Sequence, residues 1–168
     1  FHARIGTGHT TYIKALTRIS KDWPHVIGVA VAETSRLYKI LKEEGYPFLY
    51  PCEFPGRILK NKVRFINSVR RFREIVSNFK PDIVHANGGS DLFISLWSHP
   101  SLKRYKIVRT HHAIIKPLRK DPYHWFVYRR LTDANIFVSS SSFDMSTANG
   151  LIPRNSVVIK NGVDIERF

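Results

Sequence analysis

Residues 80–98, KPDIVHANGGSDLFISLWS, decide the fold class because they contain a strand, a turn and a helix in direct succession. The apolar run at 82–86 predicts a buried strand, and Asn87, Gly88 and Gly89 predict a tight turn. Ser90 or Asp91 can cap the apolar helix that follows. A strand that runs directly into a helix favours a parallel sheet, since parallel strands need such crossovers.

The same alternation of strand and helix extends over the whole chain and predicts an α/β fold. We expect a Rossmann-like three-layer sandwich with a mostly parallel sheet, forming one domain over residues 1–160, with residues 161–168 beginning a linker. Only five residues precede Gly6, and FHARI is a poor core strand, so we expect the natural first strand to be missing here. Strands are predicted at 25–32, 46–50, 82–86, 106–110, 134–139 and 156–160, and helices at 10–20, 35–45, 58–79, 90–98, 121–131 and 139–150.

Charge is the strongest feature of the composition. The 168 residues carry a formal net charge of +14, with a sequence pI near 10.2. Such a field attracts polyanions, among them nucleic acid, anionic lipid and phosphorylated substrates, without choosing among them. The single cysteine, Cys52, excludes an intrachain disulfide and fits a reducing compartment, so we expect a cytoplasmic protein.

Several motifs occur in a fixed order and resemble those of a known family. They are RIGTGHTTYIKAL (4–16), PDIVHAN (81–87), IVRTHHA (107–113), ANIFVSSSS (134–142) and VVIKNGVDIERF (157–168). Together they resemble the amino-terminal, acceptor-side domain of family 4 (group 1) retaining glycosyltransferases of the GT-B fold. The resemblance covers residues 6–168, and the terminal NGVD with its later Phe is its most specific part.

The resemblance implies an enzyme of which this chain is one half. The intact protein is expected to move a sugar from a nucleotide-diphosphate-sugar to a saccharide or lipid-linked acceptor, as in the synthesis of cell-envelope polysaccharide. A donor-binding domain is expected to follow a hinge at Asn161, Gly162 and Asp164 and to bind most of the nucleotide-sugar. The fragment alone is then expected to be inactive, and no cofactor is predicted.

The histidine pair after the strand at 106–110 holds the predicted catalytic residue. A histidine at a strand end is more often structural than catalytic, but the resemblance places His112 in the cleft, against the donor sugar. We expect His112 to position the substrate and not to act as a general base. In the family that the chain resembles, the leaving phosphate is thought to take the proton of the acceptor. Thr110 and Ser139 are expected to lie next to the residues that contact the substrate and to hold them in place.

Two loops complete the predicted site. Gly6, Thr7 and Gly8 precede a helix, where free N–H groups can approach a phosphate or sugar, although a simple tight turn explains them as well. The resemblance places them in the donor and acceptor cleft. It also makes the turn after residue 86 a wall of the acceptor pocket. The acceptor-binding residues are therefore predicted as Asn87, Gly88, Gly89, Ser90, Lys116 and Arg119. For Lys116 and Arg119 the ordinary alternative is that they are solvent-exposed charges that keep the protein soluble.

The long basic helix at 58–79 has an apolar stripe that predicts its packed face. Phe65 and Ile75 lie off this stripe. The basic face is either solvated or directed at an anionic membrane surface, so peripheral attachment to the inner face of the membrane is a further expectation. The stripe comprises Leu59, Val63, Ile66, Val69, Phe72, Val76 and Phe79.

Three other classes of protein would also be compatible with a basic α/β chain, but each requires motifs that can be looked for in the sequence. The net charge leaves open a basic nucleic-acid-binding α/β module, although no familiar nucleic-acid motif is visible. A sugar-nucleotide epimerase would need a Tyr-x-x-x-Lys pair, and a serine hydrolase would need a G-x-S-x-G turn, and neither occurs. The eight histidines show no metal-binding spacing, so no metal site is predicted.

Overall fold

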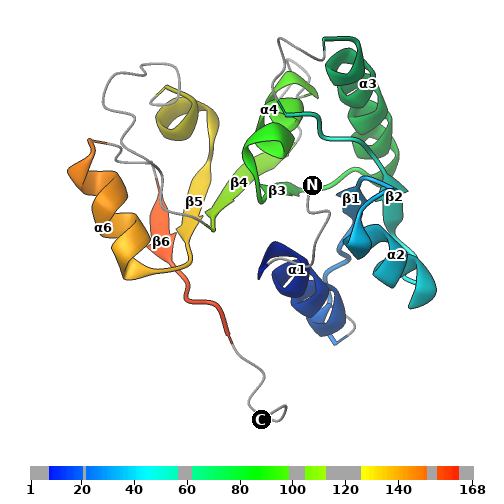
Figure 1. The fold of residues 1–168 in the computed structure, drawn as a ribbon, viewed down its shortest axis with the longest axis horizontal. Helices are drawn as coiled ribbons and strands as arrows, with labels where there is room; N and C mark the ends of the chain where they lie inside the picture. The colour runs from blue at the N-terminus through cyan, green and yellow to red at the C-terminus, as the bar shows by residue number, and fades with distance from the viewer. Residues whose placement is uncertain are drawn as a thin grey trace.

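The computed structural model describes residues 8–20, 22–56, 62–98, 105–112, 126–150 and 155–162. Helices and strands alternate along this part of the chain, as predicted (Figure 1). The elements are α1 (Gly8–Ile19), β1 (Val29–Val31), α2 (Arg36–Glu43), β2 (Leu49–Pro51), α3 (Lys62–Phe79), β3 (Ile83–Ala86), α4 (Gly89–Ser98), β4 (Lys106–His111), the π-helical turn η2 (Val127–Leu131), β5 (Ala134–Phe137), α6 (Ser140–Ala148) and β6 (Ser156–Val158).

Every described strand pair is parallel, which confirms the predicted fold class. The described strands nevertheless form two sheets where one was expected, a pair β1-β2 and a four-stranded sheet in the order β3-β4-β5-β6. No described strand bridges β1 and β3. The strand expected ahead of Gly6 falls on residues outside the described part of the chain.

Helix α2 shows how closely local sequence signals set an element's ends. The Ser35 hydroxyl accepts a hydrogen bond from the Tyr38 amide at 3.1 Å, which caps the first turn. At the other end Gly45 has φ of +66°, a left-handed conformation that glycine adopts without steric cost. The Tyr46 amide then donates to the Leu41 carbonyl at 2.9 Å, so the helix closes where the glycine predicted it.

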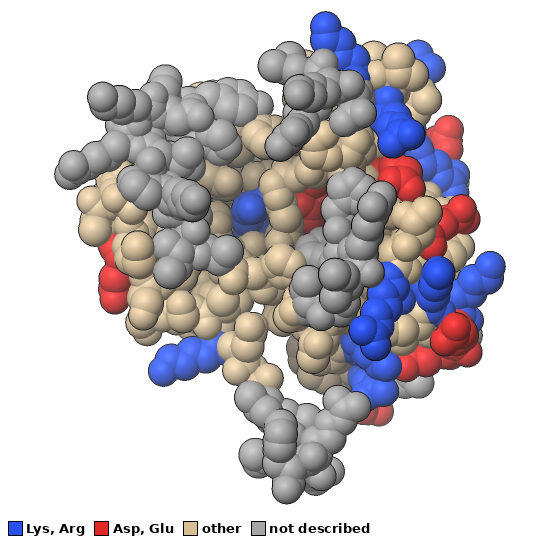
Figure 2. Space-filling view, in the orientation of Figure 1, with Lys and Arg blue, Asp and Glu red and all other residues tan. Residues whose placement is uncertain are grey.

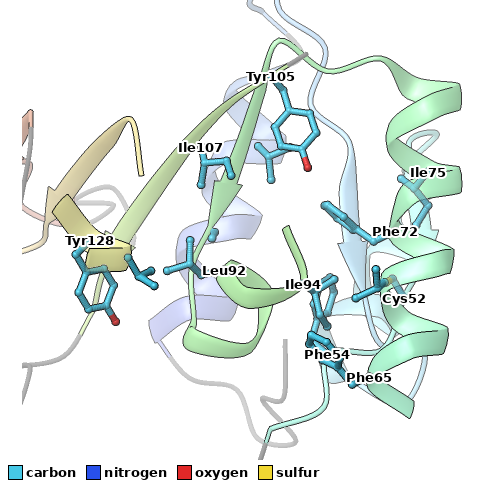
Figure 3. Close-up of a cluster of buried hydrophobic side chains, with 14 residues drawn as sticks. Cys52, Phe54, Phe65, Phe72, Ile75, Leu92, Ile94, Tyr105, Ile107 and Tyr128 are labelled. Atoms are coloured by element: carbon cyan, nitrogen blue, oxygen red, sulfur yellow. The ribbon is translucent and has the colours of Figure 1, made fainter. Parts of the chain in front are cut away.

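The core consists of two clusters. The larger one lies among α3, α4 and the strands β3 and β4, where side chains from all four elements meet (Figure 3). The smaller one joins β1 to α2 and receives Ile13 from α1. Helices α3 and α4 pack against each other, and so do α1 and α2. The larger cluster reaches Ala86 at the carboxyl end of β3, and polar side chains begin directly after it, at Asn87.

The predicted packed face of α3 is wrong by part of a turn. Phe65 and Ile75, expected off the stripe, are buried together with Val69 and Phe72. Val63 and Ile66, expected in the core, are 72% and 50% exposed. The reason is tertiary: Phe65 meets Trp97 of α4 edge to face, with ring centroids 6.0 Å apart, so α4 sets which side of α3 turns inward.

Replacing neighbouring residues of α3 tests this orientation. We expect Phe65→Ala to destabilise the protein by about 3 kcal/mol or more, because it leaves a cavity between α3 and α4. Ile66→Ala is the matched control and should change the free energy of unfolding by about 0.5 kcal/mol, because its side chain is largely in solvent. Urea unfolding of the 168-residue chain followed by circular dichroism measures both. A larger loss for Ile66→Ala than for Phe65→Ala would show that the stripe predicted from sequence was right, and equal losses would contradict the orientation seen in the structure.

Candidate functional site

The carboxyl ends of β3 and β4 bring two separate stretches of sequence together. In the parallel register Ala86, the last residue of β3, lies opposite Arg109 of β4. The turn that begins at Asn87 therefore leaves the sheet beside the segment that ends at His112. Ligands of open parallel sheets bind at this edge, outside the carboxyl ends of the strands.

Side-chain alternation along β4 separates the two histidines of the predicted site. His111 is buried, and its ring stacks on Phe137 at 4.5 Å and an interplanar angle of 14°. Its Nε2 lies 3.0 Å from Oδ1 of Asn135. His112 comes one residue later and faces the other way, toward α1. His111 is therefore part of the packed interior, and His112, which the family resemblance singled out, lies beside α1.

A chain of hydrogen bonds determines how His112 presents its ring. The Asn87 side chain donates from Nδ2 to the His85 carbonyl at 3.4 Å, which directs its amide oxygen away from that carbonyl. This oxygen lies 3.1 Å from Nε2 of His112 and can only accept. A neutral His112 therefore carries its proton on Nε2, and the lone pair of Nδ1 is left as a hydrogen-bond acceptor.

Helix α1 contributes two aromatic residues to the site that sequence reasoning missed. The rings of His9 and His112 meet edge to face with centroids 4.1 Å apart, and Tyr12 lies 5.1 Å from His112. Tyr12 also approaches the ring of His85 at 6.2 Å. A spacing of three residues places His9 and Tyr12 on one face of α1, and this was the available signal. Their partner on β4 could not be known without the tertiary structure.

The turn between β3 and α4 is held by charged groups on both sides. Oδ2 of Asp91 accepts hydrogen bonds from the amides of Asn87, at 2.7 Å, and Gly88, at 2.8 Å. The guanidinium of Arg109 donates to the Gly88 carbonyl. A Cβ added to Gly88 would lie 2.9 Å from Oδ1 of Asp91, so a larger residue there would displace the Asp91 carboxylate, whereas Gly89 has open space around it.

Burial keeps the histidines of the site neutral. It lowers the pKa of His112 to about 4, an effect strengthened by the nearby His9, His85 and Arg109. Burial, with a smaller effect of Arg109, also lowers the pKa of His111 to about 4. The pKa of His9 and that of His85 are lowered for the same main reason, although Asp91 acts in the opposite direction on both. Such an arrangement can orient a sugar hydroxyl but supplies no imidazolium charge at neutral pH.

The structure brings some of the remaining predicted residues to this edge. Gly8 is the first residue of α1, and Gly89 and Ser90 begin α4. The hydroxyl of Thr110, fully buried, lies 2.6 Å from Nε2 of His85, so Thr110 supports the site from within the sheet.

Other predicted residues lie apart from this cluster or cannot be placed. Ser139 accepts a hydrogen bond from the Ser142 amide at 3.1 Å and caps α6, the ordinary role for a serine there. Asn161 and Gly162 are exposed beyond β6. Gly6, Thr7, Lys116, Arg119 and Asp164 fall outside the described residues.

Two further properties concern the described residues alone. None of their clusters of histidine, cysteine, aspartate and glutamate could hold a metal ion. None of their helices combines the length and the apolar character needed to cross a membrane.

The lowered pKa values predict a specific pH dependence of stability. Because the folded pKa of His111 and of His112 lies below the value of about 6.5 for an unfolded chain, the unfolded state takes up protons first on acidification. Stability from these groups is therefore complete above pH 6.5 and is lost as the pH falls toward 4. NMR titration of the imidazole rings should show both neutral at pH 6, with the urea-unfolded chain as control. A ring of His112 titrating near 6.5 would contradict the burial argument.

Comparison with known proteins identifies the family of the chain. No curated protein matches the chain. The model of the family described as Glycosyltransferase Family 4 matches residues 7–167, which is nearly the whole sequence and includes every element of the site. The protein therefore belongs to glycosyltransferase family 4, of which it carries a Rossmann-like α/β domain with parallel sheets.

Proposed function

We propose that the chain is the acceptor-side domain of a retaining glycosyltransferase that uses a nucleotide-diphosphate-sugar and a saccharide or lipid-linked acceptor. The observation that carries the proposal is the oriented ring of His112, whose Nδ1 is free to accept a hydrogen bond at the carboxyl edge of the sheet. Family membership favours this activity over the nucleic-acid-binding module that the net charge left open. The donor-binding part is expected to lie in a second domain.

The role of His112 follows from its protonation state. A base whose conjugate acid has a pKa of about 4 takes a proton from a sugar hydroxyl poorly at neutral pH, because catalytic bases work best near the operating pH. A fixed acceptor atom can still hold a hydroxyl of the sugar in one orientation, which accelerates transfer by alignment. His112 is therefore a positioning group in this proposal, and Asn87 sets its tautomer.

Replacement of His112 tests the proposal. In the full-length enzyme, His112→Ala should lower turnover by about a hundredfold or more while the protein stays folded, because the sugar loses its alignment. Sugar transfer from a panel of nucleotide-diphosphate-sugars, measured with radiolabelled donor, gives the rates, and circular dichroism checks the fold. His25→Ala is the matched control, since this histidine contacts Trp23 and lies outside the site. Turnover within about twofold of the unaltered enzyme would remove His112 from the mechanism.

Attachment to an anionic membrane surface is a second part of the proposal, and the corrected orientation of α3 supports it. The exposed Val63 and Ile66 lie on α3 together with many basic residues. Trp97 of α4 is 61% exposed and contacts Phe65 near the beginning of α3. Nη2 of Arg73 donates to the Trp97 carbonyl at 2.8 Å, which joins basic and apolar groups in one patch. Exposed apolar side chains among cations are typical of surfaces that bind anionic bilayers.

Vesicle flotation distinguishes this surface from simple solvated charge. The protein should float with vesicles of phosphatidylglycerol and phosphatidylcholine at low salt, and less at high salt because the attraction is screened. Ile66→Ser combined with Trp97→Ser should reduce the bound fraction severalfold. Trp23→Ser, which removes an exposed tryptophan outside the patch, is the control. Absence of binding to the anionic vesicles at low salt would end the membrane proposal without affecting the enzymatic one.

A further inference from the structure

Arg109 is a buried cation at the edge of the sheet that carries the site. It lies on β4 three residues before His112 and is only 9% exposed. One N–H of its guanidinium group donates to the Gly88 carbonyl, and the group lies over the ring of Tyr128, 5.5 Å from the centroid. A guanidinium group has five N–H donors; one of them is used by Gly88, and the one on Nε is buried without a partner.

No carboxylate in the described part of the chain forms an ion pair with Arg109. The four ion pairs found there involve other residues. Asp91, the nearest candidate along the β3–α4 turn, spends Oδ2 on the amides of Asn87 and Gly88 and Oδ1 on that of Leu92, at 3.2 Å. Burying an arginine without a counter-charge is costly, and proteins rarely do so unless a ligand completes the pair.

The position of Arg109 points toward the substrate side of the sheet. Its donation to Gly88 shows that the side chain extends toward the carboxyl edge, where the β3–α4 turn begins. Arg109 lies on the same face of β4 as His111, and both side chains contact Tyr128. His112 lies on the other face. The two sides are linked by the β3–α4 turn, in which Gly88 accepts from Arg109 and Asn87 contacts His112. Figure 2 shows a hollow near the middle of one face of the molecule, where a basic group and, beside it, an acidic group are visible. An anion at the guanidinium of Arg109 would lie next to the turn whose Asn87 contacts the ring of His112.

We propose that Arg109 binds an anionic group of the acceptor, a carboxylate or a phosphate, and so selects acidic acceptors. The inference rests on the proposed function for the identity of the ligand as an acceptor. The planar guanidinium fork matches both kinds of oxyanion, and a charge-assisted hydrogen bond would satisfy donors that the protein leaves unused. Tyr128 and Gly88 hold the group in place beforehand, which reduces the ordering cost of binding.

Direct binding tests this site without relying on catalysis. The side-chain Nε–H resonance of Arg109, assigned through Arg109→Lys, is followed by NMR in the full chain at constant ionic strength. Glucuronate, inorganic phosphate and glucose serve as probes. We expect a saturable shift with glucuronate, with phosphate or with both, and none with glucose, because a neutral sugar offers no counter-charge. The stronger of the two anions identifies the acidic group.

Substitutions separate binding from mere support of the turn. Arg109→Gln should weaken binding of the anion about tenfold or more, through loss of a charge-assisted contact. Arg109→Lys keeps the charge without the fork and should be intermediate, and it verifies that the fold tolerates change here. Arg70→Gln, an exposed arginine of α3, is the matched control and should leave binding unchanged.

Two results would overturn the inference. One is an Arg109 resonance that ignores both anions, and the other is affinity unchanged by Arg109→Gln; either would leave Arg109 as a support for the Gly88 turn. Neither bears on sugar transfer, which the His112 experiment measures separately. Conversely, anion binding at Arg109 in a protein that transfers no sugar would overturn the proposed function and, with it, the acceptor as the ligand.

Discussion

The arrangement of the site depends on two hydrogen bonds made by the backbone of Gly88. Its amide is held by the carboxylate of Asp91 and its carbonyl by the guanidinium of Arg109, so opposite charges fix both ends of one small residue. A turn held in this way places Asn87 in one orientation, and Asn87 in turn orients the ring of His112. Charge-assisted hydrogen bonds in a partly buried setting are strong enough to preorganise such a chain of contacts before substrate arrives.

The alternation of β4 gives two adjacent histidines different roles. His111 turns into the protein, where Phe137 and Asn135 occupy its ring and its Nε2. His112 turns toward α1 and meets His9 and Tyr12. Because both rings are neutral at physiological pH, the fixed positive charge near the site comes from Arg109. In the proposed mechanism, His112 orients a sugar hydroxyl and Arg109 attracts an acidic group of the acceptor.

Helix α3 links the site to the outer surface of the domain. One side of it carries much of the larger core, packed on α4 and the strands. The opposite side carries cations and the exposed Val63 and Ile66. The buried face of such a helix anchors it in the protein. Its exposed apolar residues remain available to contact another surface. The proposed membrane patch and the acceptor site are thus joined through α4, which begins at Gly89 and carries Trp97 near its end.

The sequence by itself determined the fold class, the ends of well-capped helices and the family, because these depend on local periodicity, on residues such as Ser35 and Gly45, and on ordered motifs. It also singled out His112 and Asn87, which the structure brings within 3.1 Å of each other. Only the tertiary structure decided which side of α3 is buried, since Phe65 packs against Trp97 of α4 whereas Ile66 remains exposed. The same holds for His9, Tyr12 and Arg109, whose roles arise from residues far away in the chain. Local signals act within a few residues, whereas burial and unpaired charge exist only once distant segments have met.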